Sequence, residues 1–255
     1  MNPPRLALII HTAGQSEYLA RVLSAVAGQS RHPDEVIVAD DGSGELTGKI
    51  FDRWQAAQPY RCEHLWQERI GVRRARILNA AIAEVSADYC VFLEGDTVPH
   101  PRYIEDHLGL AKQGHFVEAP RAAIGKIATR FFGREAFGRD RSRALMALQV
   151  RGVLHAFRWP SPRRRVRGDC EGFRGGNLAV WRADLERANG FTEGLPQVGP
   201  VDADLAARLV SLGVKRLAVA GRAIGYQLWQ SPVAAAPAPV DHGRAVRMRA
   251  ENATR

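Results

Sequence analysis

Apolar residues in the first half of the chain follow two alternating patterns. Short continuous apolar runs bounded by turn-forming residues are typical of buried strands, and a spacing of three and four residues is typical of amphipathic helices. Strands that alternate with helices predict a mostly parallel α/β sheet with helices on both faces. The predicted strands are 6–10, 35–39, 64–66 and 89–93, and the predicted helices run through 19–26, 50–54 and 75–85.

Polar side chains follow three of these strands at the point where each strand ends. Thr12 follows the first strand, and Asp40 and Asp41 follow the second. Glu94 and Asp96 follow the fourth. Because ligands of parallel α/β sheets bind outside the carboxyl ends of the strands, we expect these five side chains to belong to one ligand site.

The pattern changes near residue 120. A basic stretch is followed by a glycine-rich segment, two short helices and one more strand, and the last residues are rich in Ala, Pro and charge. This composition predicts a loosely ordered tail. We divide the chain into two halves of one domain, 1–120 and 121–230, and a tail, 231–255; helices at 183–188 and 205–212 precede a strand at 216–220.

Composition and cysteine spacing narrow the class of protein. The chain has 255 residues, 45% hydrophobic and 25% charged, which is enough for one large core and ordinary for a folded enzyme. No run of 18 apolar residues predicts a membrane span, and the apolar start at 6–10 is too short for a signal peptide. The three cysteines are far apart, which argues against a disulfide framework or a zinc site. We expect a cytoplasmic protein.

Positive charge is concentrated in one segment. The net charge is +9, and 121–167, which we call the basic segment, holds 13 basic and two acidic residues. One interpretation is a solvated basic face, and another is a surface that meets an anionic acceptor or the anionic inner face of a membrane. No nucleic-acid-binding motif accompanies the charge, so we expect no nucleic-acid partner.

Several short motifs occur in order along the chain. They are 35–43 (EVIVADDGS), 94–96 (EGD), 175–177 (GGN) and the block at 190–213. Together they resemble the family 2 glycosyltransferases with the GT-A fold, over roughly residues 5–230, and the most similar subgroup includes bacterial lipopolysaccharide and capsule sugar transferases. The resemblance implies a mostly parallel GT-A (Rossmann-like) sheet, with nucleotide-sugar binding in 1–120 and the acceptor and catalytic base in the smaller region after it.

The two acids at 94 and 96 have the spacing of a divalent metal site. Transfer of a sugar from a nucleotide diphosphate develops negative charge on the leaving group, and Mn²⁺ or Mg²⁺ commonly stabilises it. Glu94 and Asp96 lie two residues apart past a strand, and Gly95 leaves room for a phosphate or sugar. The alternative is a turn with two solvated acids. Gln227 stands where relatives have a metal-ligating histidine, which makes it a further candidate ligand.

The resemblance also implies the catalytic and acceptor residues. Asp202 matches the general base, although a helix cap is the alternative for a residue at a helix start. Asp204 matches the second acid of the same block, and we expect it to hold a loop on the acceptor side. Gly176 and Asn177 are expected near the sugar, because the glycine permits close approach of the backbone.

The remaining implied residues bind the nucleotide. Thr12 and Asp40 match positions that hold the base, and Asp41 is expected to tie down the following loop. Arg76 is expected to reach the diphosphate or ribose through charge-assisted hydrogen bonds; a surface salt bridge is the alternative.

Three functions follow from the sequence. The first is an inverting transferase that moves a sugar from a nucleotide-diphosphate donor, commonly UDP-linked, to a glycan or lipid-linked acceptor with a divalent metal. The second is a degenerate homologue that binds a nucleotide or an anionic partner without catalysis, since Val201, Gln227 and Gln230 depart from the family pattern. The third is a basic membrane-surface binding protein. The joint presence of Asp40, Asp96, Asp202 and Asn177 favours the first.

Overall fold

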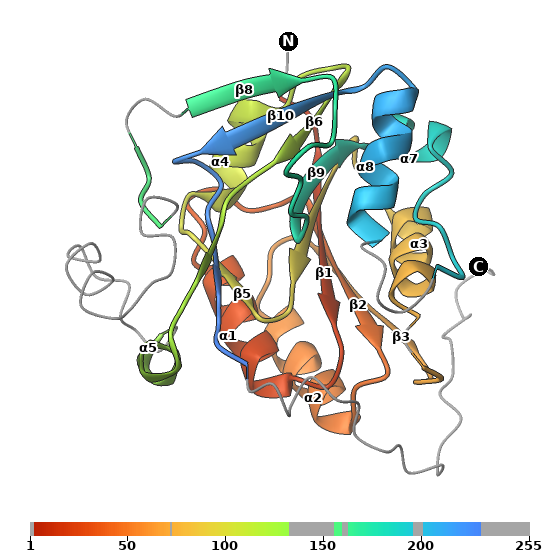
Figure 1. Cartoon of the computed structure of the whole chain (residues 1–255). Coiled ribbons are helices and arrows are strands. Elements are labelled where there is room, and N and C mark those ends of the chain that lie inside the picture. Colours follow the sequence, from red (N-terminus) through yellow and green to blue (C-terminus); the bar gives the residue numbers. More distant parts are fainter. Residues whose placement is uncertain (1–2, 72, 133–155, 160–162, 196–200, 231–255) are drawn as a thin grey trace.

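A central sheet of eight strands organises the protein. The computed structural model describes residues 3–71, 73–132, 156–159, 163–195 and 201–230. The strand order is β3-β2-β1-β4-β9-β6-β10-β8 (Figure 1). In chain order these strands are β1 (Leu6–Thr12), β2 (Glu35–Asp41), β3 (Arg61–Gln67), β4 (Tyr89–Glu94), β6 (His115–Glu118), β8 (Arg163–Arg167), β9 (Asn177–Trp181) and β10 (Lys215–Ala220).

Most of the sheet is parallel, as the sequence predicts. β1 pairs in parallel with β2 and β4, and β2 pairs in parallel with β3. β9 enters antiparallel between β4 and β6, and β8 pairs antiparallel with β10 at one edge. Both halves of the chain therefore contribute strands to one sheet. The predicted division at residue 120 stays a prediction, and the predicted tail 231–255 lies outside the described residues.

A small second sheet lies beside the large one. Its order is β5 (Thr97–Pro99), β11 (Gly225–Gln227) and β7 (Arg121–Ala123). β11 is the middle strand, antiparallel to β5 and parallel to β7. This arrangement brings the last described strand next to the loop that follows β4.

Helices cover both faces of the large sheet. Alternate residues of β1 show this directly, because Leu6, Leu8 and Ile10 belong to one buried cluster and Ala7 and Ile9 to the other. The first cluster is covered by α1 (Ser16–Ala27), α2 (Glu45–Gln55) and α4 (Tyr103–Leu110), and the second by α3 (Arg74–Glu84), α7 (Arg182–Arg187) and α8 (Val201–Ser211). The remaining described helix is α5 (Lys126–Phe131). The sequence prediction of helices on both faces is confirmed.

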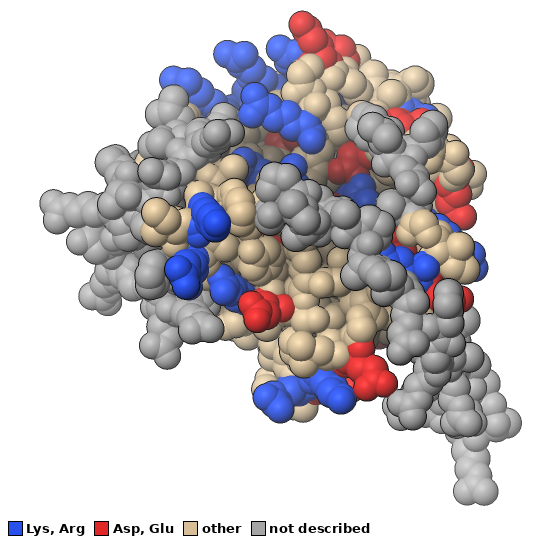
Figure 2. Space-filling model, turned by 60° about the horizontal axis from the view of Figure 1, so that its bottom comes forward, with Lys and Arg blue, Asp and Glu red and all other residues tan. Residues whose placement is uncertain are grey.

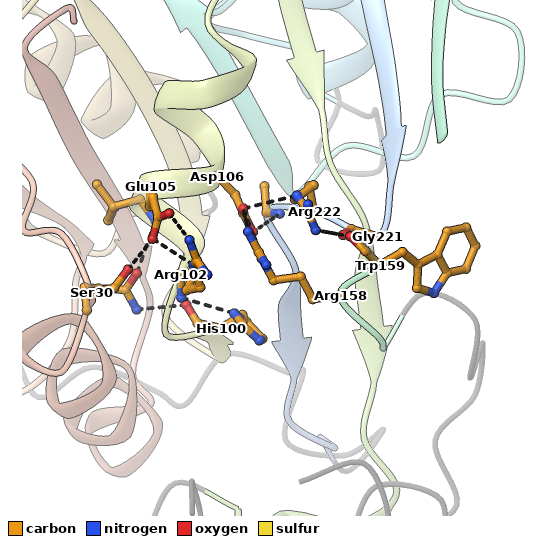
Figure 3. A network of polar contacts seen from close by, with 12 residues as sticks. Ser30, His100, Arg102, Glu105, Asp106, Arg158, Trp159, Gly221 and Arg222 are labelled. Atoms are coloured by element: carbon orange, nitrogen blue, oxygen red, sulfur yellow. Dashed lines mark hydrogen bonds and ion pairs between the residues drawn. The ribbon is translucent and has the colours of Figure 1, made fainter. Parts of the chain in front are cut away.

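One buried carboxylate fastens the later segments to α4. Asp106 accepts hydrogen bonds from the Nε of Arg158 at 3.1 Å and its Nη2 at 2.9 Å, and the Nε of Arg222 lies 3.5 Å from the same carboxylate (Figure 3). The backbone N–H of Ala223 also donates to Asp106, at 3.1 Å. Nearby in Figure 3, Arg102 pairs with Glu105. This network joins α4 to the chain on both sides of β10.

Part of the basic segment forms the free edge of the large sheet. β8 consists of Arg163, Arg164, Arg165, Val166 and Arg167, and all but the last are exposed. Figure 2 shows Lys and Arg side chains gathered along the upper edge of that view. Residues 133–155 and 160–162 of the basic segment lie outside the described part. Among the described helices, none combines the length and the apolar character that a membrane span requires.

Candidate active site

The carboxyl ends of three neighbouring strands bring the predicted nucleotide residues together. In the sheet register, Thr12 on β1 lies opposite Asp40 on β2, and His11 on β1 lies opposite Glu94 on β4. These ends point toward the bottom of Figure 1, where β1 and β2 finish side by side. The topology of the sheet therefore gathers side chains from separate parts of the chain at one place.

The two aspartates after β2 hold the surrounding loops. The Oδ1 of Asp40 accepts the backbone N–H of Ser43 at 2.8 Å, and its Oδ2 lies 3.0 Å from the Nε2 of His64. Asp41 accepts hydrogen bonds from the Nε2 of Gln67 at 2.6 Å and from the backbone N–H of Arg73 at 3.1 Å. Asp41 thus connects the end of β2 to the start of α3.

A buried arginine joins two of the predicted acids. The Nη2 of Arg74 lies 2.5 Å from the Oε1 of Glu94, and its Nη1 lies 2.6 Å from the Oδ1 of Asp202. The other oxygen of Glu94 lies 3.0 Å from the Nδ1 of His11. The other oxygen of Asp202 accepts the backbone N–H of Gly176 at 2.7 Å. Residues of β1, α3, β4, α8 and the glycine pair before β9 thereby form one cluster.

Charges in this cluster stabilise one another. Burial alone would raise the pKa of Glu94, but the charge of Arg74 and the hydrogen bond with His11 outweigh it and hold the pKa well below its usual range. Burial would lower the pKa of Arg74, but Glu94 and Asp202 raise it above its usual value. Glu94 and Arg74 are therefore both ionised at neutral pH.

Asp96 lies at the junction with the small sheet. Its Oδ2 accepts hydrogen bonds from the Nε2 atoms of Gln227 at 3.1 Å and Gln230 at 2.5 Å, and its Oδ1 accepts the hydroxyl of Thr97 at 2.9 Å. Burial raises the pKa of Asp96 above its usual value, although the hydrogen bond from Gln227 opposes the shift. The two glutamines occupy the late segment where histidine was expected from the family pattern.

Glycines before β9 permit the close approach of the side chains of Asp202 and Arg121. A Cβ at Gly175 would lie 2.6 Å from the Oδ2 of Asp202, and one at Gly176 would overlap the guanidinium of Arg121. Both glycines have positive φ, 64° and 73°, which favours glycine. A Cβ at Gly95 would lie 3.0 Å from the Oγ1 of Thr12, consistent with the predicted need for space there. The turn at 175–176 thus shapes the surroundings of Asp202 and Arg121.

Three buried polar atoms near the strand ends have no hydrogen-bond partner among the described residues. They are the Oγ1 of Thr12, the Nε2 of His11 and the Nε of Arg73. Buried polar groups are normally hydrogen-bonded, so unpaired ones call for an explanation. Because all three lie where nucleotide binding is predicted, they are candidate contacts for a ligand.

Arg76, Asn177 and Asp204 lie outside the cluster formed around Arg74. Arg76 is exposed, because it lies two residues after Arg74 and therefore on the opposite side of α3. Asn177 is fully buried, and its side chain bonds to Tyr103 Oη at 2.8 Å, His107 Nε2 at 3.3 Å and the carbonyl oxygens of Pro120 at 3.0 Å and Ala223 at 2.8 Å.

Asp204 bonds to one residue of the loop after α7 and to one residue of its own helix, α8. It accepts hydrogen bonds from the hydroxyl of Thr192 at 2.7 Å and from the Nε of Arg208 at 2.9 Å. Burial would raise the pKa of Asp204, but these two hydrogen bonds lower it below its usual value. Asp204 thus ties the loop before α8 to that helix.

Sequence reasoning missed Arg74, His11 and Arg121 as site residues, and it noted Gln230 only as a departure from the family pattern. The position of Arg74 could have been found from helical phase, because it lies three and four residues before Ile77 and Leu78, which are buried. The neighbourhood of Arg121 depends on the pairing of β7 with β11, which no local pattern predicts.

The carboxylates of Glu94 and Asp96 raise the question of a divalent metal ion that a bound ligand also coordinates. Mg²⁺ and Mn²⁺ are commonly held by one or two carboxylates together with substrate phosphates and waters. Among the described residues, no group of three or more His, Cys, Asp or Glu side chains is arranged to hold a metal ion. The charge of Glu94 is already balanced by Arg74, whereas both oxygens of Asp96 are bonded only to the neutral side chains of Gln227, Gln230 and Thr97. Asp96 is therefore the carboxylate best placed to contribute its charge to such a site.

A comparison with models of protein families identifies the family of this chain. The family model for glycosyl transferase family 2 matches residues 7–176, which is more than half of the chain and includes the strand ends described above. The chain belongs to glycosyl transferase family 2. A second family model, described as the N-terminal domain of galactosyltransferase, matches residues 158–228 of the same glycosyltransferase.

Individual relatives of this glycosyltransferase match over part of their length. Validoxylamine A glucosyltransferase from Streptomyces hygroscopicus subsp. limoneus is 30% identical over 107 residues, which is 41% of this chain and 23% of that protein. Glycosyltransferase AglE from Haloferax volcanii is 30% identical over 104 residues, 40% of this chain and 34% of that protein. The matched part is thus about a quarter to a third of each relative.

Solved structures confirm the GT-A fold of this glycosyltransferase. A mannosyltransferase from Pyrobaculum calidifontis, in complex with GDP-Man and Mn²⁺, has a TM-score of 0.60 and 20% identity over 89% of this chain and 57% of the other. TarS 1–349 from S. aureus, in complex with UDP-GlcNAc, has a TM-score of 0.62 and 14% identity over 89% of this chain and 59% of the other. The expectations of the GT-A fold and of membership in glycosyl transferase family 2 are confirmed.

Proposed function

We propose that this glycosyltransferase transfers a sugar from a nucleotide-diphosphate donor, UDP-linked in the first instance, to a glycan or lipid-linked acceptor with inversion at the anomeric carbon. The observation that carries the proposal is the environment of Asp202. Its carboxylate is held by Arg74 and by the backbone N–H of Gly176 beside the ends of the parallel strands. A carboxylate oriented in this way can act as a general base.

The proposed reaction is a single displacement. Asp202 takes the proton of the acceptor hydroxyl while that oxygen forms a bond to the anomeric carbon. The bond from the anomeric carbon to the diphosphate oxygen breaks, and the nucleoside diphosphate leaves with the electron pair. No covalent intermediate with the protein is formed, so the configuration inverts.

Residues at the strand ends are proposed to bind the donor. The unpaired hydroxyl of Thr12 and the buried Asp40 are assigned to the nucleoside, and Arg121 adds positive charge near Glu94 and Asp96. A divalent metal, when bound, would neutralise charge on the diphosphate, and Asp96 is the residue proposed to hold it. A metal shared with the donor is consistent with the Mn²⁺ and GDP-Man in the Pyrobaculum calidifontis structure.

The basic strand β8 is proposed to face the acceptor. The exposed arginines of β8 lie at the free edge of the sheet and suit an anionic acceptor or an anionic lipid surface. If the partner is an anionic lipid surface, we propose that it is the inner face of a membrane.

The proposal is tested with a panel of donors. UDP-glucose, UDP-galactose, UDP-N-acetylglucosamine and GDP-mannose are titrated in a thermal-shift assay with Mn²⁺ or with EDTA, and release of nucleoside diphosphate is measured. We expect one donor to stabilise the protein and to turn over, with turnover lost in EDTA and restored by Mn²⁺. Binding of a nucleotide without turnover would instead favour the degenerate homologue, and no binding would refute the proposal.

The role of Asp202 is tested by substitution. Asp202→Asn should retain donor binding and lose about 10²- to 10⁴-fold in turnover, the usual contribution of a general base. Asp52→Asn, on an exposed position of α2, serves as the matched control and should keep wild-type turnover. Inversion is checked by NMR of the product, and a retained configuration would contradict the mechanism.

A further inference from the structure

The side chain of Arg74 links the proposed base to the strand ends. Asp202 lies on α8 and Glu94 at the end of β4, and these elements come from different halves of the chain. Arg74 contacts both through separate nitrogens, at 2.6 Å and 2.5 Å. Because both nitrogens belong to one planar guanidinium, contacts to two different carboxylates fix the orientation of the group as well as its distance from each.

Asp202 is held at both of its oxygens. Arg74 engages Oδ1, and the backbone N–H of Gly176 engages Oδ2 at 2.7 Å. The side chain of Asp202 is 13% exposed, so its position is defined by the protein while some of its surface remains accessible. A base held in this way has its orientation set before the acceptor arrives.

Glu94 is in turn the residue that holds Arg74. Its Oε1 lies 2.5 Å from Arg74, and its Oε2 lies 3.0 Å from the Nδ1 of His11 on the adjacent strand. Removing either partner of a buried pair leaves an uncompensated charge. Glu94 therefore orders Arg74, and Arg74 orders Asp202.

We propose that Arg74 is a positioning residue for the base Asp202 and that Glu94 serves as its counter-ion, so that the connection Glu94–Arg74–Asp202 sets the catalytic geometry. This inference rests on the proposed function, because it takes Asp202 as the base. It assigns Glu94 to the base rather than to a metal and leaves Asp96 as the carboxylate for the metal.

The first test separates charge balance from positioning. The double variant Arg74→Met/Glu94→Gln removes one charge of each sign and should fold. We expect its UDP affinity, measured by calorimetry, and the KM for the donor to stay within about threefold of wild type, while kcat falls at least 100-fold, the scale expected when a base is misplaced by about 1 Å. Wild-type kcat in the folded double variant would overturn the proposal.

A conservative variant and a control sharpen this test. Arg74→Lys keeps the charge but offers a single ammonium in place of the planar fork, and we expect kcat between those of wild type and the double variant. Full wild-type kcat in Arg74→Lys would refute the need for two simultaneous contacts. Arg53→Met, an exposed arginine of helix α2, controls for the same change of side chain and should retain wild-type kcat.

The second test concerns the metal and does not use activity. With UDP present, Mn²⁺ should raise the melting temperature of Glu94→Gln as much as that of wild type, and the rise should be lost in Asp96→Asn. Loss of the Mn²⁺ effect in Glu94→Gln would contradict the assignment of Glu94. If Asp202→Asn retains wild-type turnover, the proposed function itself fails; if Asp202→Asn is inactive but the Arg74 variants are active, only this inference fails.

Discussion

Substitution of Gly175 by alanine gives a sharp test of the arrangement around Asp202. A Cβ at this position would lie 2.6 Å from the Oδ2, 2.9 Å from the Cβ and 3.2 Å from the Cγ of Asp202. Rotation of the Asp202 side chain would move the oxygen but not its Cβ. The start of α8 or the glycine turn must therefore shift.

Gly172 provides a matched control in the same loop. Its φ is 67°, close to the 64° of Gly175, but a Cβ there would have no heavy atom within 4 Å. Both alanine variants carry the cost of a left-handed residue, about 1–2 kcal/mol. Only Gly175→Ala adds a clash, and overpacking of this kind costs a further ~1–3 kcal/mol.

The two variants are expected to differ in stability and more strongly in rate. For a chain of this size, 1 kcal/mol corresponds to roughly 2–4 °C in melting temperature, so Gly175→Ala should melt several degrees below Gly172→Ala. Displacement of Asp202 by about 1 Å should lower turnover on the order of 100-fold, while Gly172→Ala should retain wild-type turnover.

The measurements are thermal unfolding and donor turnover on the same preparations. Equal melting temperatures and equal rates for Gly172→Ala and Gly175→Ala would refute the contact between the glycine turn and Asp202. An equal loss of turnover in both would show that the loop acts through its flexibility rather than through this contact.

Further predictions concern stability and surface charge. Asp106→Asn should lower the free energy of unfolding by about 3 kcal/mol in urea titrations, because Arg158 and Arg222 lose their shared carboxylate; a loss below ~1 kcal/mol would contradict this. Burial lowers the pKa of His107 from 6.5 to about 4, so its contribution to stability is full above pH 6.5 and declines by up to about 3 kcal/mol as the pH falls to 4. His107→Gln should lack this part of the decline, and an unchanged pH dependence would disprove the assignment. Arg164→Gln/Arg165→Gln should weaken co-sedimentation with phosphatidylglycerol vesicles about tenfold or more at low salt. Unaltered binding would refute the proposed contact between β8 and anionic lipid.

The sequence predicted the parallel part of the sheet because its strands are apolar on both faces. β1, β2 and β4 have long buried runs, and each ends in polar residues that the register then brings together. The antiparallel entry of β9 between β4 and β6 was not predictable, since the five residues of β9 carry no information about their partners.

The candidate site was predicted in part. The family resemblance named Asp202, and the spacing of the two acids named Glu94. Neither pointed to the arginine that contacts both, because the resemblance pointed to Arg76 and only helical phase places Arg74 inward. The family resemblance placed Gln227 at the same site as Asp96, but no local pattern pairs Asp96 with a side chain 131 residues later. Such pairings depend on the complete fold and not on local sequence.

The middle position of β11 has a consequence for synthesis of the protein. β5 and β7 are made early but pair with β11, which begins more than 100 residues after the end of each of them. A ribosome therefore releases the first two strands of the small sheet long before the strand that joins them. A chain that stops before residue 225 would lack Gln227 and Gln230, so the carboxylate of Asp96 would lose both of its glutamine hydrogen bonds even when most of the large sheet has formed.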